Sequence, residues 1–142
     1  MTTKRYLLQY RKANREIIYA QDQLEDARRI AAGLRAIIYT DMPRAQDTER
    51  DLSDAMVKVE ELEREYVATL KRCLGIRVAI EDAVSSVPNP LYKYILIQRY
   101  IAGKKPEPWE GIAEDLGKST RWVYVLHGRA LESVKSFLGT SL

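Results

Sequence analysis

The feature that most constrains this chain is a run of apolar residues that recur every three or four positions, without a break, over its first 38 residues. Such spacing places them on one stripe of a continuous helix about 50 Å long. The charged residues between them, such as Arg11, Arg15 and Glu25, are expected on the solvated face. The stripe, called the first seam, consists of Tyr6, Tyr10, Ala13, Ile17, Ala20, Leu24, Ala27, Ala31, Leu34 and Ile38.

A second run of the same kind follows after a break. Residues 40–47 contain Pro43, which cannot continue a helix, and Thr48 with Asp51 three residues later offers a capping-box-like start. Two seams of similar length joined by a short loop predict a long antiparallel helical hairpin, similar to a coiled coil. The second seam consists of Leu52, Ala55, Val59, Leu62, Tyr66, Thr69, Cys73, Ile76, Ile80, Ala83 and Val87.

Apolar residues beside both seams, among them Ile18 and Met56, cannot all be covered by two helices. Either a second copy of the chain or the C-terminal helices must pack there, and a homodimer through the hairpin is favoured. Residues 88–90, Pro-Asn-Pro, end the hairpin. They divide the chain into residues 1–87, a domain for oligomerisation, and residues 88–142, a second domain.

The second domain begins with a helix expected over residues 91–102, which is apolar all round and is closed by Gly103. Residues 109–131 then predict a helix-turn-helix. Gly117 can adopt a positive φ and end the first helix, while Ser119 can cap the second. The small shared core is expected from the apolar residues Ile112, Ala113, Leu116, Val123 and Leu126.

The outer face of this unit is where a helix-turn-helix meets the major groove of duplex DNA. Arg121 is the first candidate for base contact, because its fork of donors can pair with guanine. Tyr124 could touch a thymine methyl group or a phosphate, and His127 could bind a phosphate or remain a neutral, hydrogen-bonded side chain. Trp122 is expected in the core or hinge. Phosphate contacts are expected from Lys118, Ser119, Thr120 and Arg129.

Composition narrows the classes of function. The net charge is +3, and an acidic stretch over residues 47–65 separates two basic ones. Cys73 is the only cysteine and lies on a seam, which favours a core residue in a reducing compartment. No signal peptide or membrane span is visible, so a cytoplasmic location is expected.

No constellation of residues predicts chemistry. The stretch over residues 111–119 ends in Gly-Lys-Ser, but five residues separate its glycines where a phosphate-binding loop has four. The single histidine has no ligand partners at metal-binding spacing. The chain is therefore expected to be no enzyme and to need no metal or cofactor.

The C-terminal third resembles region 4 of bacterial sigma factors. The matching residues include Ile97-Gln98-Arg99-Tyr100, Gly103, Trp109, Ile112-Ala113, Leu116-Gly117, Ser119, Val123 and Ala130-Leu131. The whole chain is similar to the small sigma-like regulators of phages and prophages of the ArpU and RinA type. The residues typical of that group are Asp-Met-Pro-Arg at 41–44 and the run over 125–131.

This resemblance implies a DNA-binding transcription regulator in a bacterial host cell. At the base-reading positions of sigma region 4 the chain carries Thr120, Arg121, Tyr124 and Val125, so DNA contact is implied but sigma-type promoter recognition is not. RNA polymerase is a further candidate partner, and no membrane partner is expected. The expected DNA-binding residues are Lys118, Ser119, Thr120, Arg121, Tyr124, Val125, His127, Gly128 and Arg129.

Two other functions use the same parts. A phage terminase small subunit would combine a helix-turn-helix with an oligomerising hairpin to recognise packaging DNA. A protein-binding adaptor or anti-repressor would instead use the acidic face of residues 47–65 to dock a basic partner.

Overall fold

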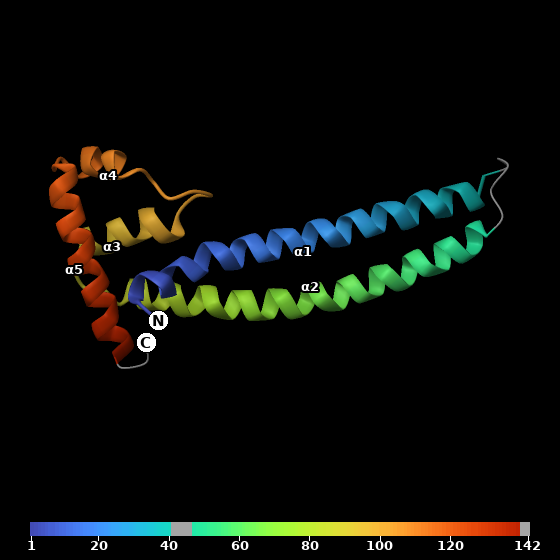
Figure 1. Ribbon diagram of the computed structural model, residues 1–142, viewed down its shortest axis with the longest axis horizontal. Coiled ribbons are helices and arrows are strands. Elements are labelled where there is room, and N and C mark those ends of the chain that lie inside the picture. The colour runs from blue at the N-terminus through green and yellow to red at the C-terminus, as the bar shows by residue number, and fades with distance from the viewer. Residues whose placement is uncertain (41–46, 140–142) are drawn as a thin grey trace. The chain divides into compact units, whose positions relative to one another are not determined.

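The structure, a computed structural model, describes residues 1–40 and 47–139, and all regular secondary structure in this part of the chain is helical. The all-α class expected from the sequence is therefore confirmed. The Asp-Met-Pro-Arg segment at 41–44 lies outside the described residues. In chain order the elements are α1 (Thr3–Ile38), α2 (Thr48–Ser85), α3 (Pro90–Leu96), the π-helix η1 (Ile97–Ile101), α4 (Trp109–Leu116) and α5 (Thr120–Leu138) (Figure 1).

The chain packs as two compact units. Unit 1 comprises Met1–Ala13 and Leu74–Leu142, and unit 2 comprises Asn14–Cys73. The first turns of α1 and the last turns of α2 therefore share a unit with the C-terminal helices. The boundaries of these two compact units thus differ from the boundary predicted between residues 87 and 88. The division into two domains at that point stays a prediction.

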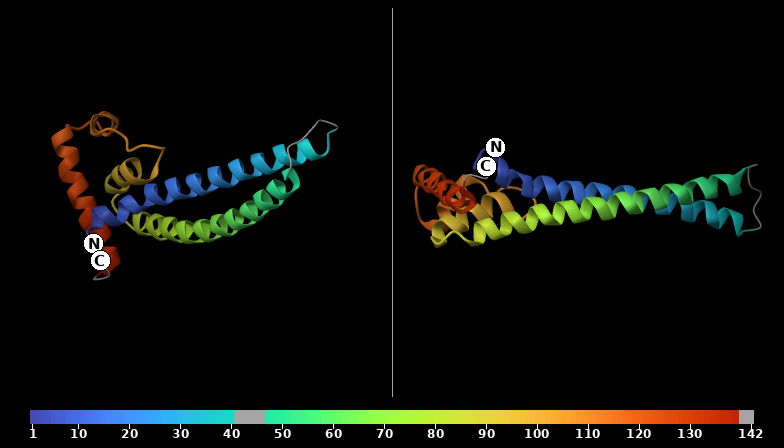
Figure 2. Two further views of the ribbon diagram at one scale, coloured as in Figure 1. Left: turned by 45° about the vertical axis from the view of Figure 1, so that its right-hand side comes forward. Right: turned by 90° about the horizontal axis from the view of Figure 1, so that it is seen from below.

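In unit 2, α1 and α2 run side by side in opposite directions (Figures 1 and 2). The polar contacts between them follow this antiparallel register, since residue numbers rise on one helix as they fall on the other. An Arg72 nitrogen lies 2.7 Å from Glu16 Oε2, and an Arg28 nitrogen lies 3.2 Å from Glu63 Oε1. Cys73, fully buried, places its Sγ 3.4 Å from Glu16 Oε2.

The two seams face inward along both helices. Each position of the first and second seams is buried or half-buried, from Tyr6 to Ile38 and from Leu52 to Val87. Cys73 is a core residue as expected, and burial raises the pKa of its thiol. Most of the intervening charged residues, such as Arg15 and Glu25, are exposed. The apolar period of the sequence therefore correctly predicts which side of each long helix is buried.

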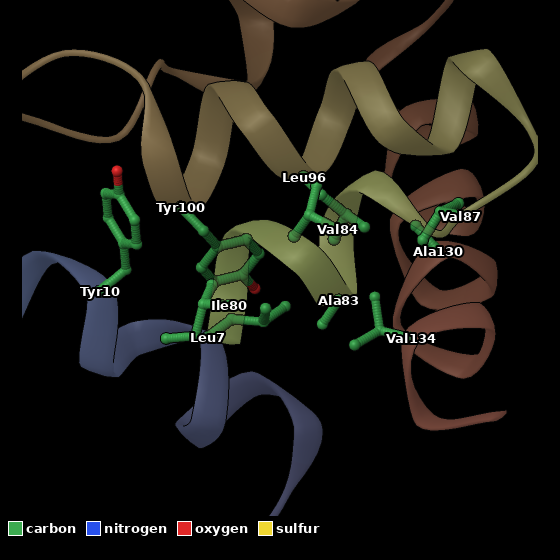
Figure 3. Packing of buried hydrophobic residues seen from close by; sticks show 10 residues of the cluster. All are labelled: Leu7, Tyr10, Ile80, Ala83, Val84, Val87, Leu96, Tyr100, Ala130 and Val134. Atoms are coloured by element: carbon green, nitrogen blue, oxygen red, sulfur yellow. The ribbon is translucent and has the colours of Figure 1, made fainter. Parts of the chain in front are cut away.

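Unit 1 has a mixed core built from five elements (Figure 3). Leu7 of α1 and Ile80 of α2 are fully buried against Leu96 of α3, Tyr100 of η1 and Val134 of α5. The remaining buried members are Tyr10, Ala83, Val84, Val87 and Ala130. The ends of the long helices thus form the platform on which the C-terminal helices of this unit pack.

The third helix differs from the continuous helix expected over residues 91–102. Asn89 caps α3, its Oδ1 accepting the amide protons of Leu91 and Tyr92. After Leu96 the chain widens into the π-helix η1, where the Ala102 amide bonds to the Ile97 carbonyl at 2.7 Å.

Arg11 corrects one expectation. The sequence placed it on the solvated face of α1, but only 6% of the residue is exposed. Its guanidinium donates to the carbonyl oxygens of Gly103 and Ala102, at 2.8 and 2.9 Å. The apolar period of α1 gave no sign of this role, because the carbonyl partners lie far along the chain.

Candidate nucleic-acid interface

A tight turn joins α4 to α5. Gly117 adopts φ 65°, and the amides of Gly117 and Lys118 bond to the carbonyls of Glu114 and Ala113. A residue with a Cβ is disfavoured in this left-handed conformation, which explains the glycine. Ser119 then begins α5, its Oγ accepting the Trp122 amide proton at 3.1 Å.

The angle between α4 and α5 is fixed by a small apolar cluster. Ile112 and Ala113 of α4 are buried against Val123 and Leu126 of α5, and Ile95 of α3 completes the cluster. Leu116 and Trp109 pack at its edge, each partly buried. The inward residues are the ones that the sequence assigned to this core, with Ile95 added from the buttressing helix.

The opposite side of α5 is exposed and carries most of the expected DNA-binding residues. Tyr124 is 50% exposed and Val125 is 41% exposed. Arg121 and Gly128 are also exposed. Tyr124 and Val125 each lie three or four residues from both Arg121 and Gly128, so the four residues share one face of the helix. A shallow groove on this face is lined by Tyr124, Val125, Gly128 and Arg129, with Tyr92 and Glu132 beside them.

The four expected phosphate ligands occupy different settings. Lys118 and Ser119 are exposed at the start of α5, whereas Thr120 is half-buried. Arg129 is exposed, and its guanidinium lies 5.3 Å from the centre of the Trp122 ring. Trp122 itself is 40% exposed, so a place in the core is wrong; its ring packs against the Arg129 guanidinium.

His127 does not lie on the exposed face. Its Nε2 is 2.8 Å from the hydroxyl of Tyr100, and the two rings stack with their centres 5.8 Å apart. In the structure the half-buried side chain uses Nε2 for this internal contact, in agreement with the alternative of a neutral, hydrogen-bonded histidine, and the phosphate contact stays a prediction. The inward position of His127 could have been predicted from its spacing. It follows buried Val123 by four residues, which puts both on one helix face.

The electrostatic setting keeps this histidine neutral. Burial, followed by the positive charges of Lys4 and Arg99, lowers the pKa of His127 to about 4. Burial also raises the pKa of Tyr100 to about 12. Both groups are therefore uncharged at neutral pH.

Trp109 is the centre of a second group of contacts that sequence reasoning missed. The Arg99 guanidinium lies 4.1 Å from the centre of the Trp109 ring, and the rings of Tyr124 and His127 meet that ring edge-on at 5.1 and 4.8 Å. These contacts join η1, α4 and α5. Through the Trp109 ring they support Tyr124 on the side that faces the protein interior, and so stabilise the position of the exposed face of α5.

Hydrogen bonds also hold the connection between η1 and α4 in place. Arg99 donates to the Glu107 carbonyl at 2.7 Å, and the Glu107 amide donates to the Gln98 carbonyl at 3.1 Å. Together with the bonds from Arg11 to Ala102 and Gly103, these bonds tie down both ends of this connection. These bonds hold α4 against η1.

Comparisons with protein-family models, curated proteins and solved structures found no match to this chain. Among residues 1–40 and 47–139 no cluster of three or more His, Cys, Asp or Glu side chains could hold a metal ion. Within the same residues no helix combines the length and apolar character needed to cross a membrane.

Proposed function

We propose that this protein is a sequence-specific regulator of transcription that binds duplex DNA through a helix-turn-helix formed by α4 and α5. In this proposal α5 enters the major groove, with Arg121 reading a base and Tyr124, Val125 and Gly128 facing the groove floor. Lys118, Ser119, Thr120 and Arg129 would contact phosphates. His127 would support α5 from its inner side through its hydrogen bond with Tyr100.

The observation that carries the proposal is the sorting of side chains on α5. Val123, Leu126 and His127 face inward, while Arg121, Tyr124 and Gly128 share the exposed face. An exposed glycine in the middle of a helix weakens that helix and has no internal packing role here, because a Cβ at position 128 would meet nothing within 4 Å. Such a residue fits a face that another molecule approaches closely.

The wider parts of the proposal rest on the likeness to sigma region 4 and on the two seams. The protein would be encoded by a phage or prophage, act in the bacterial cytoplasm and form a homodimer through the hairpin of α1 and α2. A dimer would present two copies of α5, and the distance between them would set the spacing of two half-sites. RNA polymerase is the partner through which such a regulator would act on transcription.

The test is to mix the purified full chain with sheared DNA from its source genome and to sequence the fragments retained at moderate salt. Enrichment of one short region upstream of a gene block supports the proposal. Enrichment beside packaging genes would favour a terminase small subunit instead. Binding that selects no sequence and vanishes as salt rises would contradict the proposal and favour a protein-binding adaptor.

A further inference from the structure

The core of unit 2 is thin. Among its described residues, the buried apolar ones are Leu24, Ala27, Ala31 and Cys73, of which only Leu24 has a large side chain. Two helices cannot enclose a core alone, and stable helical folds add further helices against the open side. The large apolar residues left exposed in this unit are Ile18, Tyr19, Ile30, Ile37, Tyr39, Met56, Val57 and Val67.

One side of this two-helix layer carries two rows of residues, each one position after a seam residue. We call this side the groove face. Its α1 row contains Arg28, Ala32 and Arg35, and its α2 row contains Met56, Glu60 and Glu63; these six residues line one hollow between the helices. A second hollow shares Glu60 and Glu63 and continues along α2 past Val67 to Lys71.

In the first hollow the charges are separated by helix, and in the second hollow the basic Arg64 and Lys71 of α2 lie beside the glutamates. In the first hollow the α1 row presents the positive side chains of Arg28 and Arg35, and the α2 row presents the negative side chains of Glu60 and Glu63. Arg28 and Glu63 form an ion pair, yet 56% and 48% of these two side chains remain exposed. Charges that remain this open to solvent can interact with a second molecule.

We propose that the groove face is the surface through which two copies of this chain associate into a four-helix bundle, with a two-fold axis parallel to α1 and α2. This axis lays α1 of one copy antiparallel against α2 of the other. Arg28 of each copy then lies opposite Glu63 of its partner, and Arg35 lies opposite Met56, about one helical turn from Glu60. An axis across the helices would instead set α1 against α1, with arginine facing arginine.

A second copy fits this face better than an unrelated helix does. A partner segment of one charge would match only one of the two rows, whereas the pattern of arginines on α1 and glutamates on α2 is complementary to itself. Ala31 and Ala32 lie in the hollow, and small side chains allow helix axes to approach to about 8–10 Å. Met56 and Val67, 42% and 49% exposed, would be covered in the bundle.

This inference deepens the homodimer named under the proposed function, but it does not require that the protein bind DNA. It is tested by sedimentation equilibrium of the full chain at low and moderate salt, with two charge-reversal variants. Arg28→Glu/Arg35→Glu makes every charged side chain of the first hollow acidic, and Glu60→Arg/Glu63→Arg makes every one of them basic. The control, Asp54→Arg/Glu65→Arg, makes the same charge change at exposed positions on the opposite side of α2.

The wild type and the control are expected to be dimers. Each groove-face variant alone is expected to dimerise at least about 10-fold more weakly, and an equimolar mixture of the two to form a heterodimer. This rescue separates association from folding, because each variant has lost the Arg28–Glu63 pair within its own chain. Helicity measured by circular dichroism identifies an unfolded variant, which is then replaced by its Gln counterpart, for which a smaller loss of dimer is expected.

The inference would be overturned by a wild type that stays monomeric at about 100 μM, by variants that dimerise as well as the wild type, or by a mixture that does not associate. A ring of eight or more subunits would also overturn it, since a two-fold bundle closes at two. DNA binding by a monomeric protein would leave the proposed function standing while refuting the bundle, so the two claims can fail separately.

Discussion

Gly128→Ala is expected to stabilise the protein and weaken its binding to DNA. Gly128 lies inside α5, is exposed, and is not among the glycines with positive φ. A Cβ built at this position meets nothing within 4 Å, so the methyl group adds no clash within the chain. Replacing glycine by alanine in an exposed helix interior contributes about 0.8–1 kcal/mol, which for a domain of this size raises Tm by about 3 °C.

The same methyl group would stand on the face that the proposal sets against the major groove. Overpacking a close interface costs about 1–3 kcal/mol, so affinity for a specific duplex should fall by about fivefold or more. Thermal unfolding followed by circular dichroism measures the first effect, and fluorescence anisotropy with a labelled duplex measures the second. Gly75→Ala is the matched control, because Gly75 is also exposed inside a helix with open space around its Cβ position.

The control should gain stability without losing affinity for DNA. A decrease in Tm for Gly128→Ala would contradict the helical environment described for this residue. A rise in Tm with unchanged affinity would show that DNA does not approach α5 at Gly128, and the exposed face would have to be reassigned.

Two further predictions concern stability. The pKa of His127 is about 4 in the folded protein, below its ordinary value of about 6.5. The neutral His127 side chain therefore makes its full contribution to the free energy of unfolding above pH 6.5, and this contribution is lost as the pH falls towards 4. Urea titrations should show a loss of up to about 3 kcal/mol over this range that His127→Gln lacks; equal pH dependence in both proteins would refute the assignment. Arg11→Met should cost about 2–4 kcal/mol in urea unfolding, because the carbonyls of Ala102 and Gly103 lose their donors, whereas the exposed Arg15→Met should change stability by less than about 0.5 kcal/mol. Equal effects of the two arginine substitutions would contradict the anchoring role of Arg11.

The sequence was most informative where burial follows a local period. The two seams, the capping serine Ser119 and the turn glycine Gly117 could all be predicted, because each depends on residues within one or two helical turns. The same periodicity also predicts the inward position of His127, which lies four residues after Val123. Its polar side chain, however, suggested the outer face.

The remaining features depend on partners far along the chain or on unusual backbone geometry. Arg11 is buried because it meets carbonyls of Ala102 and Gly103, and no pattern within α1 signals them. The π-helix has no sequence signature that distinguishes it from an α-helix of the same composition. Trp122 was misplaced because its size suggested a core residue, although it stands one position before Val123 and so off the buried stripe.

The central claim, that α5 reads DNA sequence, is tested most directly by Arg121→Ala. Anisotropy titrations at one fixed salt concentration would compare the wild type with this variant on the selected duplex and on a random duplex. Arg121→Ala is expected to weaken binding to the selected duplex by about 1–3 kcal/mol and to affect the random duplex far less. Lys118→Ala, which removes a proposed phosphate contact, should weaken both about equally. An equal loss on both duplexes for Arg121→Ala would contradict the claim.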